Sequence, residues 1–271
     1  MTATPIALTI AGSDSGGGAG IQADLKAFSA LGVYGASVIT ALTAQNTRAV
    51  TAVHEAPPEM IAAQLAAVFD DLDVRAVKIG MLSSVPIIET VAEALTGHTI
   101  PVVLDPVMVA KSGDALLAAD AVSALRERLL PLATVITPNL PEAACFLNDD
   151  PARNVAEQQA QGEALLALGA SAVLMKGGHA DGAVCVDLLL QRDYEIERFE
   201  AQRISTRNTH GTGCTLSSSI AAGLARGLSL GAAVGAAHRY LHGAIRAADA
   251  LSVGGGHGPV HHFHALWDNP T

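Results

Sequence analysis

Aromatic residues and long, uninterrupted apolar runs are scarce in this sequence. Phe, Trp and Tyr make up 3% of its 271 residues, whereas half of the residues are hydrophobic. This composition is typical of Ala-, Val- and Leu-rich helices packed on a sheet, and a single domain over residues 1–271 is expected. The weakly polar stretch 211–237 contains Arg226 and several Ser and Gly residues, so we expect buried helices there rather than a membrane span.

Positive charge and cysteine are also in short supply. Lys and Arg number 16 against 26 Asp and Glu, which gives a net charge of −10, and no run of basic residues occurs. Nucleic acid and anionic membranes are therefore poor partners, and any phosphate must be bound by local groups. The three cysteines lack CxxC spacing, which argues against a disulfide framework or a cysteine-based metal site. The amino terminus does not resemble a secretion signal, so we expect a cytoplasmic protein.

Short β-rich apolar runs alternate with helical patterns along the chain. Strands are predicted at 6–10, 37–42, 76–79, 102–104, 135–136 and 172–175. This alternation predicts βα units and a mostly parallel sheet, with a later hairpin at 183–190 and 194–199. Ligands bind beyond the carboxyl ends of parallel strands. The segments that follow four of these strands are therefore expected to line one crevice; they begin at Gly80, Asp105, Thr137 and Lys176.

The segment NTHGTGCT at 208–215 precedes a long apolar stretch and places two glycines and a thiol where a helix begins. Helix starts carry unpaired backbone N–H groups and a positive dipole end, so Gly211 and Gly213 can wrap a phosphate oxygen. Among the same N–H groups, the pKa of the Cys214 thiol is expected to fall, which makes it a candidate base or nucleophile. The alternative is a glycine turn before a buried helix with an inert core cysteine.

Three charged residues are candidates to act with this turn. Lys176 ends a buried strand, where an unpaired ammonium would be costly, so it requires a bound triphosphate or a structural carboxylate as partner. Asp105 and Glu142 are the candidate carboxylates for Mg²⁺, which is usually held by one or two carboxylates plus phosphates and waters. Glu142 would also suit the first turn of a helix whatever the function.

The glycine-rich segment 11–20 follows the first strand but completes neither G-x-G-x-x-G nor a Walker motif, which removes the main support for NAD or P-loop nucleotide binding. We expect it to bring backbone N–H groups and Asp24 against a small polar ligand; the alternative is a tight connection with a surface Asp. His210 and His179 are candidates to contact nucleotide or the backbone. The histidines at 257, 261, 262 and 264 favour a packed or exposed tail over a metal site.

Six motifs together resemble the hydroxymethylpyrimidine/phosphomethylpyrimidine kinases of thiamine biosynthesis, within the ribokinase-like superfamily. They are AGSDSGGGAGIQADLK near the start, KIGML at 78–82, VLDPVM at 103–108, TPNLPEA at 137–143, MKGGH at 175–179 and NTHGTGCT at 208–215. The resemblance implies a three-layer α/β/α sandwich that uses ATP and Mg²⁺. It implies phosphorylation of 4-amino-5-hydroxymethyl-2-methylpyrimidine to its monophosphate and then to its diphosphate, and it suggests a homodimer.

The resemblance also implies residue roles. The residues implied to bind the pyrimidine are Gln45, Gly12, Asp24, Met81 and Met108, and those implied to bind the nucleotide are Asn139, Lys176, Thr209 and Thr212. Mg²⁺ would be organised by Glu142 and Asp105. Transfer of the phosphoryl group would be assisted by Lys176, Gly211, Gly213 and Cys214. Cys214 replaces the Asp usual in sugar kinases and would take the proton of the hydroxymethyl group in the first step. Pyridoxal or pyridoxine kinase, and a non-catalytic ligand-binding relative, remain alternatives; an NAD-linked oxidoreductase is disfavoured.

Overall fold

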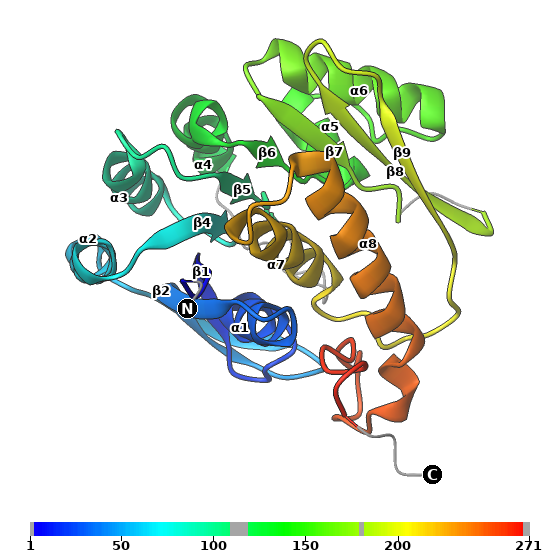
Figure 1. Cartoon of the computed structure of the whole chain (residues 1–271), viewed down its shortest axis with the longest axis horizontal. Helices are drawn as coiled ribbons and strands as arrows, with labels where there is room; N and C mark the ends of the chain where they lie inside the picture. The colour runs from blue at the N-terminus through cyan, green and yellow to red at the C-terminus, as the bar shows by residue number, and fades with distance from the viewer. Residues whose placement is uncertain (1–2, 109–118, 179–181, 268–271) are drawn as a thin grey trace.

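A sheet between two layers of helices forms the described part of the protein, which in this computed structural model comprises residues 3–108, 119–178 and 182–267 (Figure 1). Within these residues the sheet has nine strands in the order β3-β2-β1-β4-β5-β6-β7-β8-β9. Strands β2, β1, β4, β5, β6 and β7 run parallel, whereas β3, β8 and β9 pair antiparallel with their neighbours. The predicted three-layer sandwich with a mostly parallel sheet is confirmed.

The strand bounds extend several of the predicted runs. The strands are β1 (Ile6–Asp14), β2 (Tyr34–Gln45), β3 (Val50–Glu55), β4 (Val74–Ile79), β5 (Val102–Leu104), β6 (Val135–Ile136), β7 (Ala172–Met175), β8 (Val184–Gln191) and β9 (Glu197–Gln202). Strand β1 continues four residues beyond the predicted end, into the glycine-rich segment, because its last residues still pair with β2. This extension carries Ser13 and Asp14 to the rim of the sheet.

The helices cover the two faces of the sheet as separate layers. They are α1 (Gly20–Ala30), α2 (Pro58–Asp71), α3 (Val85–Leu95), α4 (Ala119–Ala124), α5 (Leu140–Leu147), α6 (Val155–Ala167), α7 (Thr212–Ala225) and α8 (Leu230–Arg246), with a π-turn at Leu125–Leu129 and 3₁₀ turns at Leu130–Leu132 and Ala248–Ala250. Helices α1, α7 and α8 share one apolar cluster, and α2 to α6 share the other. Residues 211–237 thus hold the two packed helices expected there.

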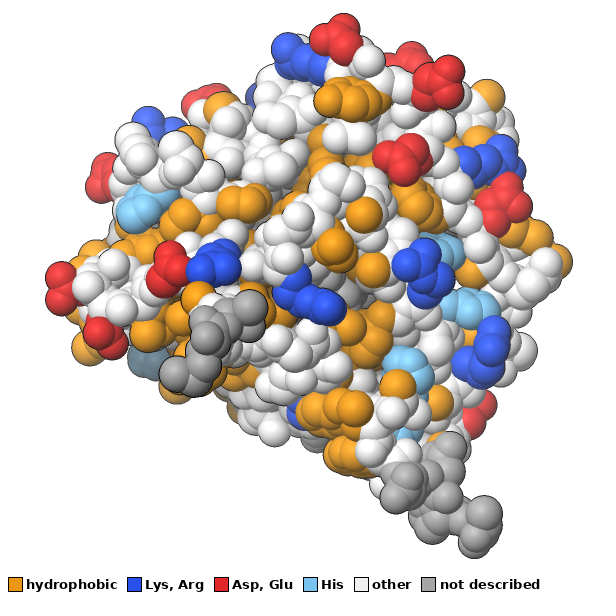
Figure 2. Space-filling view, in the orientation of Figure 1, with side chains coloured by type: hydrophobic (Ala, Val, Ile, Leu, Met, Phe, Trp, Pro, Cys, Tyr) orange, Lys and Arg blue, Asp and Glu red, His pale blue; other side chains and the backbone are white. Residues whose placement is uncertain are grey.

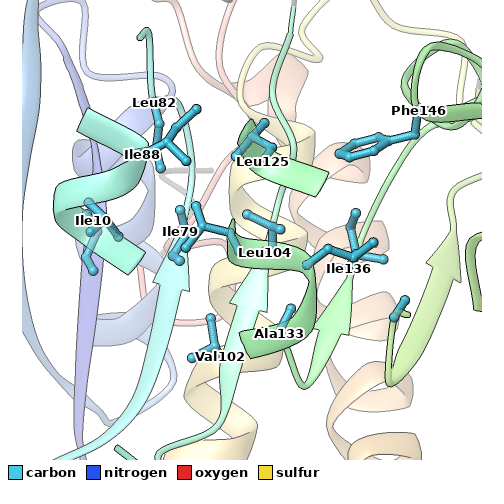
Figure 3. Close-up of a cluster of buried hydrophobic side chains, with 14 of the residues drawn as sticks. Ile10, Ile79, Leu82, Ile88, Val102, Leu104, Leu125, Ala133, Ile136 and Phe146 are labelled. Carbon is cyan, nitrogen blue, oxygen red and sulfur yellow. The ribbon is translucent and has the colours of Figure 1, made fainter. Parts of the chain in front are cut away.

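One apolar cluster shows how the strands and helices fit together. Ile79, Leu104 and Ile136 come from adjacent strands β4, β5 and β6 and are fully buried. Figure 3 shows them facing Ile88 of α3 and Phe146 of α5. Burial on both faces explains why these parallel strands read as short continuous apolar runs. Among the described residues, no helix is long and apolar enough to cross a membrane.

On the face seen in Figure 2, acidic and basic side chains are scattered among apolar ones rather than gathered by sign. The edge strand β3 is almost wholly exposed on both sides. Strand β3 was absent from the sequence-based prediction because it lacks the apolar face from which half-buried strands are recognised. It forms through antiparallel pairing with β2 instead.

Candidate active site

A large cavity lies at the carboxyl ends of the parallel strands and at the start of α7. Its volume is about 1800 Å³. The predicted site residues that line it are Gly12, Gln45, Met81, Asp105, Met108, Asn139, Glu142, Lys176, Thr209, Gly211, Thr212, Gly213 and Cys214. The four segments that follow β4, β5, β6 and β7 therefore meet as the strand pattern predicted. The Cys214 thiol and the Lys176 ammonium face this same space.

The glycine turn opens helix α7 against the glycine-rich loop. Gly211 is the N-cap residue in the left-handed conformation, with φ of 80°. A Cβ added there would overlap the carbonyl oxygen of Gly18, so only glycine permits this close approach. A Cβ at Gly213 would lie 3.6 Å from both Asp105 Oδ2 and Lys176 Nζ. The N–H groups at the start of α7 and the Lys176 ammonium thus lie side by side, which is a suitable arrangement for an anion.

Lys176 is paired with carboxylates in the protein itself. Its Nζ lies 2.9 Å from Asp105 Oδ1 and 3.6 Å from Glu142 Oε2. Burial alone would lower the pKa of Lys176, but these two carboxylates raise it above its usual value. Burial opposes ionisation of Asp105, yet Lys176 and Lys78 hold its pKa below the usual value. The structural ion pair that the sequence left as an alternative is therefore present, whether or not a triphosphate also binds.

Asp105 and Glu142 are each fixed by further hydrogen bonds. Thr137 Oγ1 donates to Asp105 Oδ1, and Ser217 Oγ donates to Asp105 Oδ2, each at 3.1 Å. Glu142 closes a capping box at the start of α5: its carboxylate accepts from the Asn139 N–H at 2.7 Å, and Asn139 Oδ1 accepts from the Glu142 N–H at 2.8 Å. Burial raises the pKa of Glu142 although Lys176 opposes this. Glu142 thus both starts a helix and faces the cavity.

Asp24 occupies a different place from either of those the sequence suggested. It is fully buried and does not line the cavity, so both the ligand contact and the surface position predicted for it are wrong. Its Oδ2 accepts from Lys78 Nζ at 2.8 Å and from Thr9 Oγ1 at 2.7 Å. The 54 residues between Asp24 and Lys78 concealed this pairing in the sequence.

Lys78 is a functional candidate that the sequence reasoning missed. It lies on β4, has no solvent exposure and yet reaches the wall of the cavity. Burial alone would lower its pKa, but Asp24, with smaller contributions from Cys214 and Asp105, raises it above the usual value. The sequence did hold a signal, since a lysine within the apolar run of a buried strand requires a buried counter-charge.

Cys214 does not have the lowered thiol pKa that its place at a helix start suggested. Burial is the largest effect and raises the pKa of Cys214 to about 11, with Asp24 and Asp105 adding to the rise. Lys78 and a hydrogen bond from the backbone of Gly20 act in the opposite direction but do not compensate. The prediction of a lowered pKa is wrong because burial and nearby carboxylates outweigh the helix dipole.

The glycine-rich loop is organised around Asp14. The Asp14 carboxylate accepts from the N–H groups of Gly16, Gly18 and Ala19 at 2.8, 3.0 and 2.8 Å. His210 Nε2 lies 2.8 Å from Asp14 Oδ2. Burial alone would raise the pKa of Asp14, but His210 and the backbone N–H groups hold it below the usual value. His210 therefore ties this loop to the segment that opens α7.

The histidine-rich tail packs against the start of α7. His261 and His262 are buried, and His262 Nε2 lies 2.9 Å from Thr215 Oγ1. The Tyr240 hydroxyl donates to the His262 carbonyl at 2.6 Å. Burial lowers the pKa of His262 to about 3, so the ring is neutral near pH 7. The described part of the tail is a packed segment, and His179 lies outside the described residues.

Comparison with known proteins identifies the family. The phosphomethylpyrimidine kinase family model matches residues 14–261. The chain belongs to this family. A hydroxymethylpyrimidine/phosphomethylpyrimidine kinase of Rhizobium meliloti is 61% identical over 97% of this chain and 99% of its own length. The protein of that name from Escherichia coli is 56% identical over 96% of this chain and 98% of its own length.

Solved structures agree with this assignment. A phosphomethylpyrimidine kinase from Clostridium difficile is 47% identical, with a TM-score of 0.77 over 87% of this chain and 97% of its own. An ADP complex of Bacillus subtilis pyridoxal kinase is 38% identical, with a TM-score of 0.90 over 98% of this chain and 100% of its own. This phosphomethylpyrimidine kinase family member is accordingly a phosphotransferase with the ribokinase-like fold.

Proposed function

We propose that this kinase uses ATP to phosphorylate 4-amino-5-hydroxymethyl-2-methylpyrimidine to its monophosphate and then to its diphosphate. The observation that carries the proposal is that Lys176, the glycine turn, Cys214 and Gln45 line the same cavity. The names of relatives at 56–61% identity over nearly the full length support the choice of substrate. A cavity of about 1800 Å³ has room for both a nucleotide and a small ring.

The end of the cavity that is lined by Lys176 and the glycine turn stabilises the phosphoryl group during its transfer. Phosphoryl transfer depends on positioning and charge stabilisation more than on covalent chemistry. Lys176 and the N–H groups from Gly211 to Cys214 supply fixed positive charge and donors for the transferring phosphoryl. Thr209 and Thr212, together with Asn139 across the cavity, contact the nucleotide.

The other end of the cavity receives the ring. Gln45 hydrogen-bonds the pyrimidine, and Met81 and Met108 supply apolar contacts to its faces. A Cβ at Gly12 would lie 2.6 Å from the Met81 methyl carbon, so glycine at this position leaves Met81 free to lie along the cavity wall.

The carboxylates near Lys176 suit Mg²⁺ that arrives with ATP. In the described residues, no group of three or more His, Cys, Asp or Glu side chains forms a ready-made cation site. Asp105 and Glu142 present the oxygen chemistry that Mg²⁺ prefers, and that ion usually takes its remaining ligands from phosphates and water. These two residues would hold the ion, and when bound it neutralises phosphate charge. Lys78 and Lys176 do not offset Asp24, Asp105 and Glu142, so a triphosphate needs this accompanying cation.

Cys214 acts as the base for the alcohol in the first phosphorylation. Its thiolate form accepts the hydroxymethyl proton as the oxygen attacks the γ-phosphorus of ATP. The second acceptor is a phosphate oxygen with a second pKa of about 6, so it is already ionised near neutral pH and needs no base. The two steps therefore place different demands on the same residue.

Single-turnover ADP release with the pyrimidine alcohol and with its monophosphate tests the proposal. Wild-type protein is expected to turn over both acceptors with ATP and Mg²⁺. The Cys214→Ala variant is expected to slow the alcohol step by about 10²–10⁴-fold, the usual contribution of a positioned base, with a much smaller effect on the phosphate step. Equal losses for both acceptors would remove Cys214 from the role of base, and no ADP release by wild-type protein would support a non-catalytic relative.

Pyridoxal is the second candidate substrate, because 98% of the chain superposes on a pyridoxal kinase with a TM-score of 0.90. Turnover of both alcohols under matched conditions decides between them. We also propose a cytoplasmic homodimer; the exposed apolar residues Leu42 on β2 and Val53 on β3 support a contact between copies. Sedimentation of the purified protein and cell fractionation test these two points.

A further inference from the structure

Gln45, the residue assigned to the pyrimidine, is held at its backbone by Ser15. Ser15 Oγ donates to the Gln45 carbonyl and accepts from the Gln45 N–H, each at 2.8 Å. The side-chain carboxamide lies between Thr43 and His210: its Oε1 is 3.1 Å from Thr43 Oγ1, and its Nε2 is 3.5 Å from His210 Nε2. The two ends of a carboxamide have the same shape, so its hydrogen-bond partners decide which end faces which neighbour.

Thr43 has no proton to give to Gln45. A hydroxyl carries one proton, and Thr43 Oγ1 lies 2.8 Å from the Ser13 carbonyl oxygen, which can only accept. The Thr43 proton is therefore committed to Ser13, and towards Gln45 the Thr43 oxygen can only accept. If the carboxamide oxygen faced Thr43 Oγ1 at 3.1 Å, two oxygen lone pairs would repel each other. If the carboxamide NH₂ faced it, the NH₂ would donate a hydrogen bond to Thr43 Oγ1.

His210 leads to the same orientation through an independent contact. Asp14 accepts from several backbone N–H groups, and its pKa is held below the usual value, so it is ionised near neutral pH. His210 Nε2, 2.8 Å from Asp14 Oδ2, must then carry a proton to donate. Facing that N–H, the Gln45 NH₂ would be a second donor without an acceptor, whereas the carboxamide oxygen accepts a share of the same proton.

We infer that Thr43 and His210 act together as positioning residues that hold the Gln45 carboxamide with its NH₂ towards Thr43 and its carbonyl towards His210, and thereby fix the direction of the bound pyrimidine. A 180° rotation of the carboxamide gives a hydrogen bond to Thr43 Oγ1 at 3.1 Å and replaces the donor–donor contact with His210, at 3.5 Å, by a favourable contact between its N–H and the carboxamide oxygen. The inference rests on the proposed function for the identity of the ring, but the orientation itself rests on the protein alone.

The fixed carboxamide reads one edge of an aminopyrimidine. Ring N3 accepts and the neighbouring 4-amino group donates, which matches the donor and acceptor of a glutamine in a bidentate pair. With Gln45 oriented as above, N3 faces the Thr43 side and the amino group faces the His210 side. The C5 hydroxymethyl arm is next to the amino group, so it also points to the His210 side, where the chain continues into the turn from Gly211 to Cys214. The same orientation disfavours binding of a 4-oxo pyrimidine, in which N3–H donates and the 4-carbonyl accepts. It also disfavours a pyridine alcohol, which lacks this pair of neighbouring acceptor and donor groups.

Thr43→Val tests the inference by removing the acceptor with little change of shape. The measured quantity is the ratio of kcat/KM for the 4-amino alcohol to that for its 4-oxo analogue. We expect the ratio to fall about tenfold, the effect of one hydrogen bond of ordinary strength. Thr43→Ser keeps the hydroxyl and is expected to restore the ratio. Thr51→Val is the matched control, because the Thr51 hydroxyl donates to the backbone of Ala44 at 3.0 Å without contacting the Gln45 carboxamide.

The outcomes separate this inference from the proposed function. If wild-type protein phosphorylates the 4-amino alcohol but Thr43→Val keeps the same ratio as Thr51→Val, the positioning role is refuted and the function stands. The orientation is also measured directly in wild-type protein without substrate, by nuclear Overhauser contacts from the Gln45 amide protons in glutamine-labelled samples. Contacts to the Thr43 methyl are expected, and contacts to the His210 ring instead would overturn the inference even if a variant failed to fold or the substrate were a different one.

Discussion

Replacing Lys78 with Met removes one charge from the buried pair behind the cavity. Lys78 and Asp24 have no solvent exposure, and their Nζ–Oδ2 distance is 2.8 Å. Met fills a similar volume, but it leaves Asp24 with only the hydrogen bond from Thr9, and Asp24 Oδ1 already lacks a partner among the described residues. Breaking one side of a buried ion pair costs about 3–5 kcal/mol, because the remaining charge is left without compensation.

In the variant, Asp24 can take up a proton instead of remaining charged. The cost of this protonation limits the loss of folding stability and makes the loss depend on pH. Holding a carboxyl of ordinary pKa about 3.9 protonated at pH 7 costs about 4 kcal/mol, at about 1.36 kcal/mol per pH unit. Burial already raises the pKa of Asp24 with Lys78 present, and removing Lys78 raises it further. A group whose pKa is raised on folding loses stability as pH increases above its unfolded value. Because Asp24 takes up its proton at higher pH in the variant than in wild-type protein, the Lys78→Met penalty is expected to shrink between pH 7 and pH 5, by at most about 3 kcal/mol.

Urea unfolding at pH 7 and pH 5 measures both quantities. The double variant Lys78→Met/Asp24→Leu removes both charges and is expected to recover most of the stability, as apolar replacements of buried pairs commonly do. Thr9→Val is the control: it loses one hydrogen bond, worth about 1 kcal/mol, and keeps the ion pair. A Lys78→Met penalty below about 1 kcal/mol at pH 7, or one that is equal at both pH values, would refute the reasoning.

Three further predictions concern residues around the cavity. Because burial raises the pKa of Cys214 to about 11, the rate of the alcohol step is expected to rise about tenfold per pH unit from pH 7 to 10, whereas the phosphate step and Cys214→Ala stay nearly flat in stopped-flow assays. His262, with its pKa lowered to about 3, binds a proton more readily when unfolded, so wild-type protein is expected to lose about 2 kcal/mol from this group as pH falls from 7 to 5. His262→Gln is expected to lack that loss in urea titrations. Gly211→Ala, at φ of 80° and against the Gly18 carbonyl, is expected to cost at least about 1–2 kcal/mol and to impair both phosphorylation steps; unchanged kinetics would mean that the turn does not hold the phosphoryl group.

The position of the cavity could be predicted from the sequence because it depends on where the strands end. It does not depend on contacts between side chains that are distant in sequence. Strands β4, β5, β6 and β7 are short apolar runs, and each is followed at once by a polar or glycine residue. Parallel strands end at the same edge of a sheet, so the chain order alone brings Met81, Asp105, Asn139 and Lys176 together. The glycine turn before α7 was predictable for a similar local reason, since glycines mark a helix start that approaches other backbone closely.

The electrostatics of the site depend on partners that are distant in sequence, and here the sequence reasoning failed. Asp24 lies one turn into α1, which suggested a ligand contact, but 54 residues separate it from the Lys78 that it pairs with. The helix start predicted a low pKa for Cys214, yet burial and the carboxylates of Asp24 and Asp105 decide the outcome. No pattern of spacing reports such burial or such long-range pairs, so the sign of the pKa shift could be found only in the fold.

A cysteine that rests as a neutral thiol suits a kinase with two unlike acceptors. With a pKa of about 11 for Cys214, ionising the thiol near pH 7.5 costs about 5 kcal/mol, which the alcohol step must bear. The thiolate so formed is a correspondingly stronger base towards a weakly acidic hydroxyl. In the second step, the acceptor is a phosphate monoester of about −2 charge, and a permanent thiolate would repel it. Under the proposed mechanism the neutral thiol adds no charge at that point, so the burial that weakens Cys214 as a resting base would also let the phosphorylated intermediate bind beside it.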